Sequence, residues 1–245
     1  MPDFRDKLYE RYVSTFKGIE EPGPATLRSN EDWARRRILP LLSDVDPGAP
    51  VLELGCGQGE MLALLRSEGF ESVHGVDISS EQVARAVARG LDVRTGEARQ
   101  VLAAARSRFA AILAFDFFEH FTKDELLEIL PLVHDALRPG GTLLLRTPNG
   151  DGLFPNQVVH GDLTHLTIFN EGSMGQVLRL HGFVDVECRE TGPVPGNLVG
   201  WLRTLAWSVI RSLANLVRRI ETGKTQRIWT ENLICRARRG DKEVS

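Results

Sequence analysis

Three glycines at alternate positions mark a place in this sequence where a small molecule could bind. The segment ELGCGQG at 53–59 follows a run typical of a strand and precedes a run typical of a helix. Gly55, Gly57 and Gly59 let the backbone turn sharply and leave no Cβ atom in the way of a ligand, while the start of the helix offers unpaired N–H groups. We therefore predict a cradle for a small molecule at this turn.

Asp77 supplies a second group that could bind the same ligand. It ends the next strand-like run, 77 − 53 = 24 positions after Glu53, where doubly wound folds place a carboxylate against the two hydroxyls of a ribose. The alternative is an ordinary carboxylate that caps the helix near Ser79. Because Gly-x-Gly-x-Gly differs from the Gly-x-Gly-x-x-Gly that holds a dinucleotide pyrophosphate, the pattern disfavours NAD.

The elements that carry these residues alternate in the order of a parallel sheet with crossover helices. We predict strands at 51–55, 72–77, 91–94, 109–116 and 141–149, and a final antiparallel pair at 183–190 and 227–239. We predict helices at 59–68, 79–89, 122–137 and 170–181. The third opens with a capping box of Thr122 and Glu125, and Pro131 is expected to kink or divide it. The fold class is α/β, a Rossmann-like, doubly wound, mostly parallel seven-stranded sheet with an antiparallel last strand.

The composition sets limits on partners and location. Hydrophobic residues make up 42% of the chain and charged residues 26%, as in an ordinary folded protein, and a net charge of −3 gives no general attraction to nucleic acid. Cys56, Cys188 and Cys235 are too few and too scattered for a disulfide framework, which fits a reducing compartment. The charged N-terminus lacks the apolar stretch of a signal peptide, so we expect a cytoplasmic protein.

Five motifs, taken in order, resemble those of the class I methyltransferases that use S-adenosyl-L-methionine. They are ELGCGQG, VDIS at 76–79, GEA at 96–98, FDFFEH at 115–120 and LRPGGTLLLRTPN at 137–149. The resemblance covers about residues 51–149. It implies methyl transfer as the activity and S-adenosyl-L-methionine as the cofactor.

By this resemblance, each motif binds one part of the cofactor. The glycine turn, which begins at Glu53 and includes Cys56 and Gln58, lies under the methionine part. Asp77 holds the ribose and Ile78 packs on the adenine. The remaining contacts are Glu97 and Ala98 near the amino edge of adenine, and Phe115 and Asp116 in the lining of the pocket. Family members often carry Asp where this chain has Glu97.

We expect one methyltransferase domain over residues 1–245, because this length suits a single large core with insertions. Its parts are an N-terminal helical lid at 1–48, a cofactor-binding core at 49–190, an amphipathic helical insertion at 191–226 and a final strand at 227–239.

Methyl transfer mainly needs alignment of the acceptor, the methyl carbon and the sulfur, and a base helps when the acceptor is a hydroxyl. His165, in the polar loop at 160–170, is the leading candidate for the base, and Asp162 could orient it. The alternative is that His165 bonds to the backbone of its own loop. His120, beside Glu119, is a second candidate, although this position more often has a structural role in the family.

A metal site is an alternative use of the same region. Asp116, Glu119, His120 and His165 resemble, in part, the Glu-x-x-Glu-His and downstream His of small-RNA 2′-O-methyltransferases. Asp116 replaces a Glu of that pattern, and metal-free members of the class share Asp-x-x-Glu-His, so our main prediction has no metal. The acidity of the chain also disfavours an RNA substrate.

The segment Leu198 to Ile220 predicts an amphipathic helix whose arginines lie on one half and whose large aliphatic residues lie on the other. It contains no acid before Glu221, and its arginines exclude a membrane-spanning helix. One interpretation is peripheral contact with the inner face of a membrane. The others, which we favour, are packing on the domain itself, on a second subunit of a homodimer, or over the substrate as a lid.

Three further segments resemble methyltransferases of bacterial O-antigen and cell-surface glycan synthesis: the C-terminal ETGKTQRIWTENLICRARR, the THLTIFN loop and the N-terminal ERYVSTFKG. This implies a sugar hydroxyl or a related small metabolite as the acceptor. A helix from Asp3 to Phe16 would then cover the cofactor, with Tyr9, Arg11 and Tyr12 in contact with it. A non-catalytic cofactor-binding or membrane-associated protein is the remaining alternative.

Overall fold

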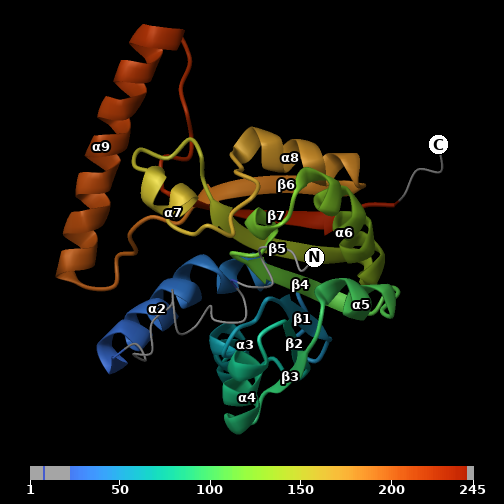
Figure 1. Cartoon of the computed structure of the whole chain (residues 1–245). Helices are drawn as coiled ribbons and strands as arrows, with labels where there is room; N and C mark the ends of the chain where they lie inside the picture. The colour runs from blue at the N-terminus through green and yellow to red at the C-terminus, as the bar shows by residue number, and fades with distance from the viewer. Residues whose placement is uncertain (1–7, 9–22, 242–245) are drawn as a thin grey trace.

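The computed structural model describes residue 8 and residues 23–241, which form a seven-stranded sheet with helices on both faces (Figure 1). The strand order is β3-β2-β1-β4-β5-β7-β6. The strands are β1 (Val51–Leu54), β2 (Val73–Asp77), β3 (Asp92–Thr95), β4 (Phe109–Phe115), β5 (Leu137–Pro148), β6 (Phe183–Glu190) and β7 (Asn232–Arg239). Strands β1 to β5 pair in parallel, and β7 lies antiparallel between β5 and β6. The predicted Rossmann-like fold is confirmed.

Two groups of helices cover the sheet. One core cluster joins the sheet to α5 (Ala98–Ala103), α6 (Lys123–Ala136) and α8 (Glu171–Leu180). The other joins it to α2 (Pro24–Arg37), the short helix η2 (Leu39–Leu42), α3 (Glu60–Ser67) and α4 (Ser80–Ala88). Strand β4 and, apart from Glu53, strand β1 are apolar, and both are almost wholly buried because helices cover both faces of the sheet. The sheet is therefore a rigid base for groups at its edge.

The helix predicted to start at Thr122 shows the capping box with Glu125. Pro131 lies inside α6, which nevertheless runs unbroken over 14 residues, so the proline does not divide it. The last strand starts at Asn232, five residues later than the predicted 227. The predicted N-terminal contacts Tyr9, Arg11 and Tyr12 lie outside the described residues.

Cys188 and Cys235 form a disulfide, so our interpretation that the cysteines are too scattered to pair is wrong. The cysteines therefore no longer support a reducing compartment. The two residues are 47 positions apart, but they face each other in the register of β6 and β7, with Cα atoms 4.1 Å apart. Composition and spacing do not reveal strand register, and register brings them together. Cys56 is buried and unbonded.

The predicted amphipathic insertion is α9 (Leu198–Thr222), a single helix of 25 residues. Figure 1 shows it standing at one side of the molecule, away from the sheet. No helix within the described ranges is long and apolar enough to cross a membrane.

Candidate active site

A large cavity opens at the carboxyl ends of the central strands. Its volume is about 1570 Å³. It lies where the strand order reverses between β1 and β4, the position at which open α/β sheets bind ligands. Because small-molecule sites usually measure roughly 300–1,000 Å³, this cavity has room for a cofactor and an acceptor together.

The glycine turn between β1 and α3 forms one wall of the cavity. Gly55, Gly57 and Gly59 have φ angles of 64°, 54° and 74°, a left-handed conformation that favours glycine. A Cβ atom on Gly55 would lie 2.9 Å from Cδ2 of Phe117, and one on Gly57 would lie 3.0 Å from Oε1 of Gln82. The turn is therefore shaped as predicted, with its backbone close to the space that a ligand would fill.

Asp77 joins this turn to the end of β2. Its Oδ2 accepts a hydrogen bond from the Gly57 N–H at 2.8 Å, and its Oδ1 accepts one from the Ser79 N–H at 2.8 Å. Each carboxylate oxygen keeps a second lone pair, which a ribose hydroxyl could use. The next residue, Ile78, is a large apolar side chain that is 53% exposed and lines the cavity, as a platform for an adenine ring would be.

Glu53 leaves a polar atom unsatisfied at the cavity. Its side chain is buried, and its Oε2 has no hydrogen-bond partner among the residues that the structure describes. Burial raises the pKa of Glu53 well above its ordinary value, and the nearby carboxylates of Glu60 and Asp77 add to the effect. A buried acceptor without a donor is costly, and the amino group of a bound methionine moiety could supply that donor. This atom and the glycine turn fit S-adenosyl-L-methionine.

Of the twelve residues that the resemblance assigned to the cofactor, eleven line the cavity. The exception is Gly59, which precedes α3 and whose added Cβ would meet the side chains of Leu91 and Ala86 instead. Gly59 immediately precedes the helix in a left-handed conformation, and it is not part of the cavity lining. Burial raises the pKa of the Cys56 thiol, so this residue lines the site as a neutral group.

Arg146 and Trp33 lie in the cavity wall, and sequence analysis missed both. Arg146 is the register partner of Phe115 and forms a two-point ion pair with Asp116. Its guanidinium carbon lies 5.7 Å from the ring centre of Trp33, whose indole N–H donates to the Thr191 carbonyl at 2.7 Å. The sequence did contain a signal for Arg146, since an arginine within the apolar run LLLRTP must find a partner for its charge in a buried strand. Nothing in the sequence placed Trp33 here.

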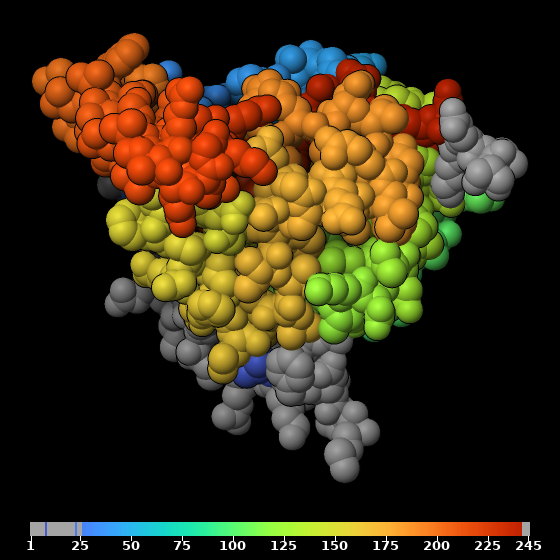
Figure 2. Space-filling view, turned by 90° about the horizontal axis from the view of Figure 1, so that it is seen from above, coloured from blue at the N-terminus to red at the C-terminus, as the bar shows by residue number. Residues whose placement is uncertain are grey.

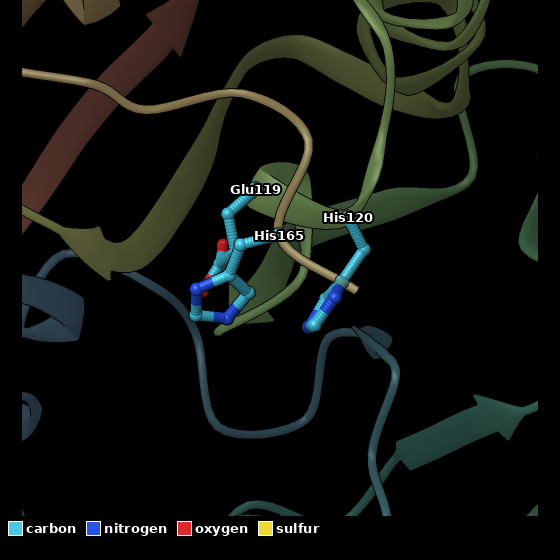
Figure 3. Close-up of side chains that lie close together, drawn as sticks. All are labelled: Glu119, His120 and His165. Atoms are coloured by element: carbon cyan, nitrogen blue, oxygen red, sulfur yellow. The ribbon is translucent and has the colours of Figure 1, made fainter. Parts of the chain in front are cut away.

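Glu119, His120 and His165 come together in the wall of the same cavity, and Figure 3 shows their side chains close to one another. One ligand atom from each lies within 4.8 Å of the others, and the two imidazole centres are 5.0 Å apart. The loop that carries His165 is held against the short helix η3 (Phe118–His120). The N–H groups of Leu166 and Thr167 donate to the Glu119 carbonyl at 2.7 and 3.1 Å.

Asp162 supports His120 through Thr164. Its Oδ1 accepts from the Thr164 N–H at 2.8 Å and from the Thr164 hydroxyl at 2.6 Å. Nδ1 of His120 lies 2.9 Å from that hydroxyl oxygen and 3.3 Å from the Thr164 carbonyl oxygen. Because a carbonyl can only accept, Nδ1 carries the proton in this arrangement and the lone pair is on Nε2.

His165 makes a backbone contact close to the one that we weighed against its catalytic role. Its Nδ1 lies 3.4 Å from the Val159 carbonyl, one residue before the loop at 160–170. Its backbone N–H donates to the Asp162 carbonyl at 3.2 Å. Val159 lies in α7 (Asn156–His160), and His160 at the end of that helix is exposed. The contacts of the Asp162 side chain with Thr164 thus lead to His120, and orientation of His165 by Asp162 stays a prediction.

The surroundings of Glu119 and His120 favour the uncharged forms of these two side chains. Burial raises the pKa of Glu119 to about 8, helped by the charge of Asp116. Its Oε2 accepts from the Thr147 hydroxyl at 3.1 Å, and its Oε1 has no partner in the described chain. Burial and the neighbouring His165 lower the pKa of His120. Near neutral pH the cluster therefore offers a neutral imidazole, the form that accepts a proton.

The same three side chains could instead bind a divalent ion, since one carboxylate and two imidazoles suit zinc and other transition metals. Asp116, the fourth residue of the metal alternative, is not part of this group. Its carboxylate pairs with Arg146. The candidate metal site therefore has three protein ligands, one fewer than the four residues that the sequence suggested.

Comparison with known proteins gives one family match and one group of curated relatives. Residues 27–188 match the family described as "Methyltransferase domain". The cyclopropane mycolic acid synthase MmaA2 of Mycobacterium tuberculosis is 30% identical over 110 residues, which cover 43% of this chain and 38% of that protein. The match therefore spans well under half the length of this relative.

Solved structures show the same fold over nearly the whole chain. An S-adenosylmethionine-dependent methyltransferase from Archaeoglobus fulgidus superposes with a TM-score of 0.66 at 20% identity, covering 96% of this chain and all (100%) of that one. Phosphoethanolamine N-methyltransferase 2 of Haemonchus contortus, solved with S-adenosyl-L-methionine, has a TM-score of 0.61 at 16% identity, covering 98% and 61%. At these identities the likeness establishes the fold alone.

Proposed function

The chain belongs to the methyltransferase-domain family and is an S-adenosyl-L-methionine-dependent methyltransferase, and from that premise we propose that it methylates a hydroxyl group of a sugar, a glycan or a related small metabolite. When bound, S-adenosyl-L-methionine supplies a methyl group on a positively charged sulfur. The residues described above must then hold the cofactor, place the acceptor in line with it and remove the proton of the hydroxyl.

The observation that carries the proposal is the pair of imidazoles of His120 and His165 in the wall of the cavity, of which burial keeps that of His120 neutral. A hydroxyl is a weak nucleophile whose proton must leave as the new bond forms, and histidine is the usual acceptor of that proton. The Asp162–Thr164 contacts support a tautomer of His120 with its lone pair on Nε2. We assign proton removal to His120 and His165 together, with His120 as the better supported of the two.

The rest of the cavity wall supports a polyhydroxylated acceptor. Besides Trp33, its lining outside the predicted cofactor motifs includes Gln157, Thr191, Glu231 and Asn232. Amide, hydroxyl and carboxylate groups can each exchange hydrogen bonds with sugar hydroxyls, and the face of an indole can cover the apolar side of a sugar ring. A wall of this kind suits a sugar better than an alkyl chain.

The test is transfer of an isotopically labelled methyl group from S-adenosyl-L-methionine to a panel of monosaccharides and nucleotide-linked sugars, with products identified by mass spectrometry and NMR. We expect a methyl ether on one ring hydroxyl. Transfer to a lipid chain, which the name of the mycobacterial relative would suggest, with none to any sugar, would overturn the sugar proposal.

The histidines are tested with His120→Ala and His165→Ala, and His160→Ala is the matched control, because it removes an exposed imidazole that ends α7 near the same loop. Loss of the base should lower kcat by roughly 10²–10⁴-fold while leaving cofactor affinity nearly unchanged. Full turnover in both site variants would show that neither imidazole takes the proton.

Metal-assisted methylation is the second candidate, favoured by the 4.8 Å grouping of Glu119, His120 and His165. It predicts that a chelator abolishes turnover and that one divalent ion restores it. Metal analysis of the purified protein decides the matter: turnover without bound metal and unaffected by chelator would remove this candidate. Among metal-assisted acceptors, RNA is disfavoured by the net charge of −3.

A further inference from the structure

Helix α9 presents its apolar face to solvent. None of its 25 residues is buried. Eleven large apolar side chains on it are between 44% and 80% exposed: Leu198, Val199, Trp201, Leu202, Leu205, Val209, Ile210, Leu213, Leu216, Val217 and Ile220. In Figure 2 the helix forms a ridge at one edge of the molecule. Exposed apolar patches of this extent on a folded protein usually mark an interaction surface.

The polar face of α9 holds it to the rest of the protein. Glu190, at the end of β6, accepts from Arg211 at 2.8 Å and from the indole N–H of Trp207 at 3.2 Å. Farther along, Oδ1 of Asn215 accepts from the Gln226 N–H at 2.7 Å. A surface helix normally packs its apolar side on the core, and here the arrangement is reversed. Packing of the apolar face on its own domain, one of the uses that we favoured, is therefore wrong.

The charges beside the apolar face are positive up to the last turn of the helix. At 100° per residue the large aliphatic side chains fill an arc of about 140°, with Arg203 at one border and Arg219 near the other. No Asp or Glu occurs from Leu198 to Ile220, and Glu221, in the last turn, falls at the same angle as Arg203. Over most of its length the surface is thus an apolar strip bordered by arginines.

Either a second copy of α9 or a lipid surface could cover this apolar strip, and the charges favour one of the two. A second copy of the helix would bring arginine against arginine, with Glu221 as the one acid within α9 to pair with them. An anionic lipid surface complements both borders and accepts the whole apolar arc. The helix is also about 37 Å long at 1.5 Å per residue, and its broad arc exceeds the narrow seam of a two-helix contact.

We infer that α9 lies flat on an anionic membrane surface, with its apolar arc in the headgroup region and Arg203 and Arg219 among the lipid phosphates. The rest of the protein then lies on the side of α9 away from the lipid, where Arg211 of the helix contacts Glu190. This inference rests on α9 alone and does not depend on the acceptor proposed above.

Flotation with vesicles tests it, using pure phosphatidylcholine and a mixture that is roughly one third phosphatidylglycerol. The wild-type protein should float with the anionic vesicles and much less with the neutral ones. Leu205→Glu/Leu213→Glu should bind the anionic vesicles at least about tenfold more weakly, and Arg203→Gln/Arg219→Gln about tenfold more weakly. The matched control is Leu127→Glu/Leu180→Glu, which adds the same charges at exposed apolar positions of α6 and α8 and should bind like the wild type.

Sedimentation velocity without lipid tests the alternative, a dimer formed through α9. If the wild type is a dimer that Leu205→Glu/Leu213→Glu converts to a monomer, the occupant is a second copy. Absence of binding to either vesicle also overturns the inference. Because α9 packs on the body through its polar face, substitutions on the outer face should leave the melting temperature unchanged, which separates lost binding from lost folding.

Discussion

The backbone N–H of Gly57 donates a hydrogen bond of 2.8 Å to the Asp77 carboxylate, which ties the cofactor turn to the end of the neighbouring strand. The other oxygen of Asp77 accepts from Ser79 at 2.8 Å. The structural role that we considered for Asp77 is therefore present, and it is compatible with the ribose contact that we predict. One carboxylate sets the shape of the turn and remains able to accept from a ribose.

Replacing Asp77 by Ala should weaken cofactor binding by about 10- to 100-fold, since one or two hydrogen bonds to a charged group are lost and the turn loses its anchor. Calorimetric titration with S-adenosylhomocysteine measures the change. Glu81→Ala is the control, because Glu81 is an exposed carboxylate in the first turn of α4 whose partner is Arg85. Equal affinity in the Asp77 variant would show that the ribose is held elsewhere.

Gly55→Ala should both destabilise the protein and impair cofactor binding. The residue has φ of 64°, and the added methyl group would lie 2.9 Å from the Phe117 ring at the cavity. The control Gly90→Ala has a similar φ of 73° but nothing within 4 Å of the new Cβ atom. We expect both variants to lose about 1 kcal/mol of stability from backbone strain. Only Gly55→Ala should weaken cofactor binding as well, so equal affinities in the two variants would contradict a role for close packing at this turn.

The sequence was informative where local pattern determines structure. Apolar runs and glycine turns predicted the strands, and Thr122 with Glu125 predicted the start of α6, because these signals depend on neighbours in the chain. The position of the predicted cofactor residues around one cavity was also predictable, since β1, β2 and β4 carry most of them at their carboxyl ends. The motifs that bear these residues are short and continuous.

What could not be predicted depends on contacts between distant segments. The Cys188–Cys235 bond requires the register of β6 and β7, and the support of His120 by Thr164 requires the folded position of a loop 44 residues away. The sequence predicted the amphipathic pattern of α9 correctly. It could not show which face would turn outward, because that depends on Glu190 in another element.

The disulfide predicts how many cysteine thiols are free to react with a reagent. Under denaturing, non-reducing conditions one thiol per chain, that of Cys56, should react with a thiol reagent, and after reduction all three cysteines should react. Cys188→Ser should raise the non-reduced count to two, because it frees Cys235. Three reactive thiols before reduction would mean that β6 and β7 pair without the bond.

Glu119 should make the stability of the protein depend on pH. Its pKa rises from an ordinary value of 4.5 to about 8 because the carboxyl is buried and lies near Asp116. Between these two values the folded state keeps a proton that the unfolded state has lost, so the free energy of unfolding contributed by this group falls as pH rises through that window. Below pH 4.5 the carboxyl is protonated in both states and the penalty is absent.

Glu119→Gln removes the ionisable group while keeping an oxygen that can accept from Thr147. We expect the variant to be more stable than the wild type at pH 8 by on the order of 1–3 kcal/mol, and to show little difference near pH 5. Urea unfolding at the two pH values measures this, with Glu128→Gln as the control, since that carboxylate is mostly exposed and pairs with Arg99. If the two variants respond alike at both pH values, Glu119 ionises as an ordinary surface carboxylate. The neutral form of His120, which burial favours, would then be opposed by a charged Glu119, because a carboxylate beside the ring stabilises the imidazolium.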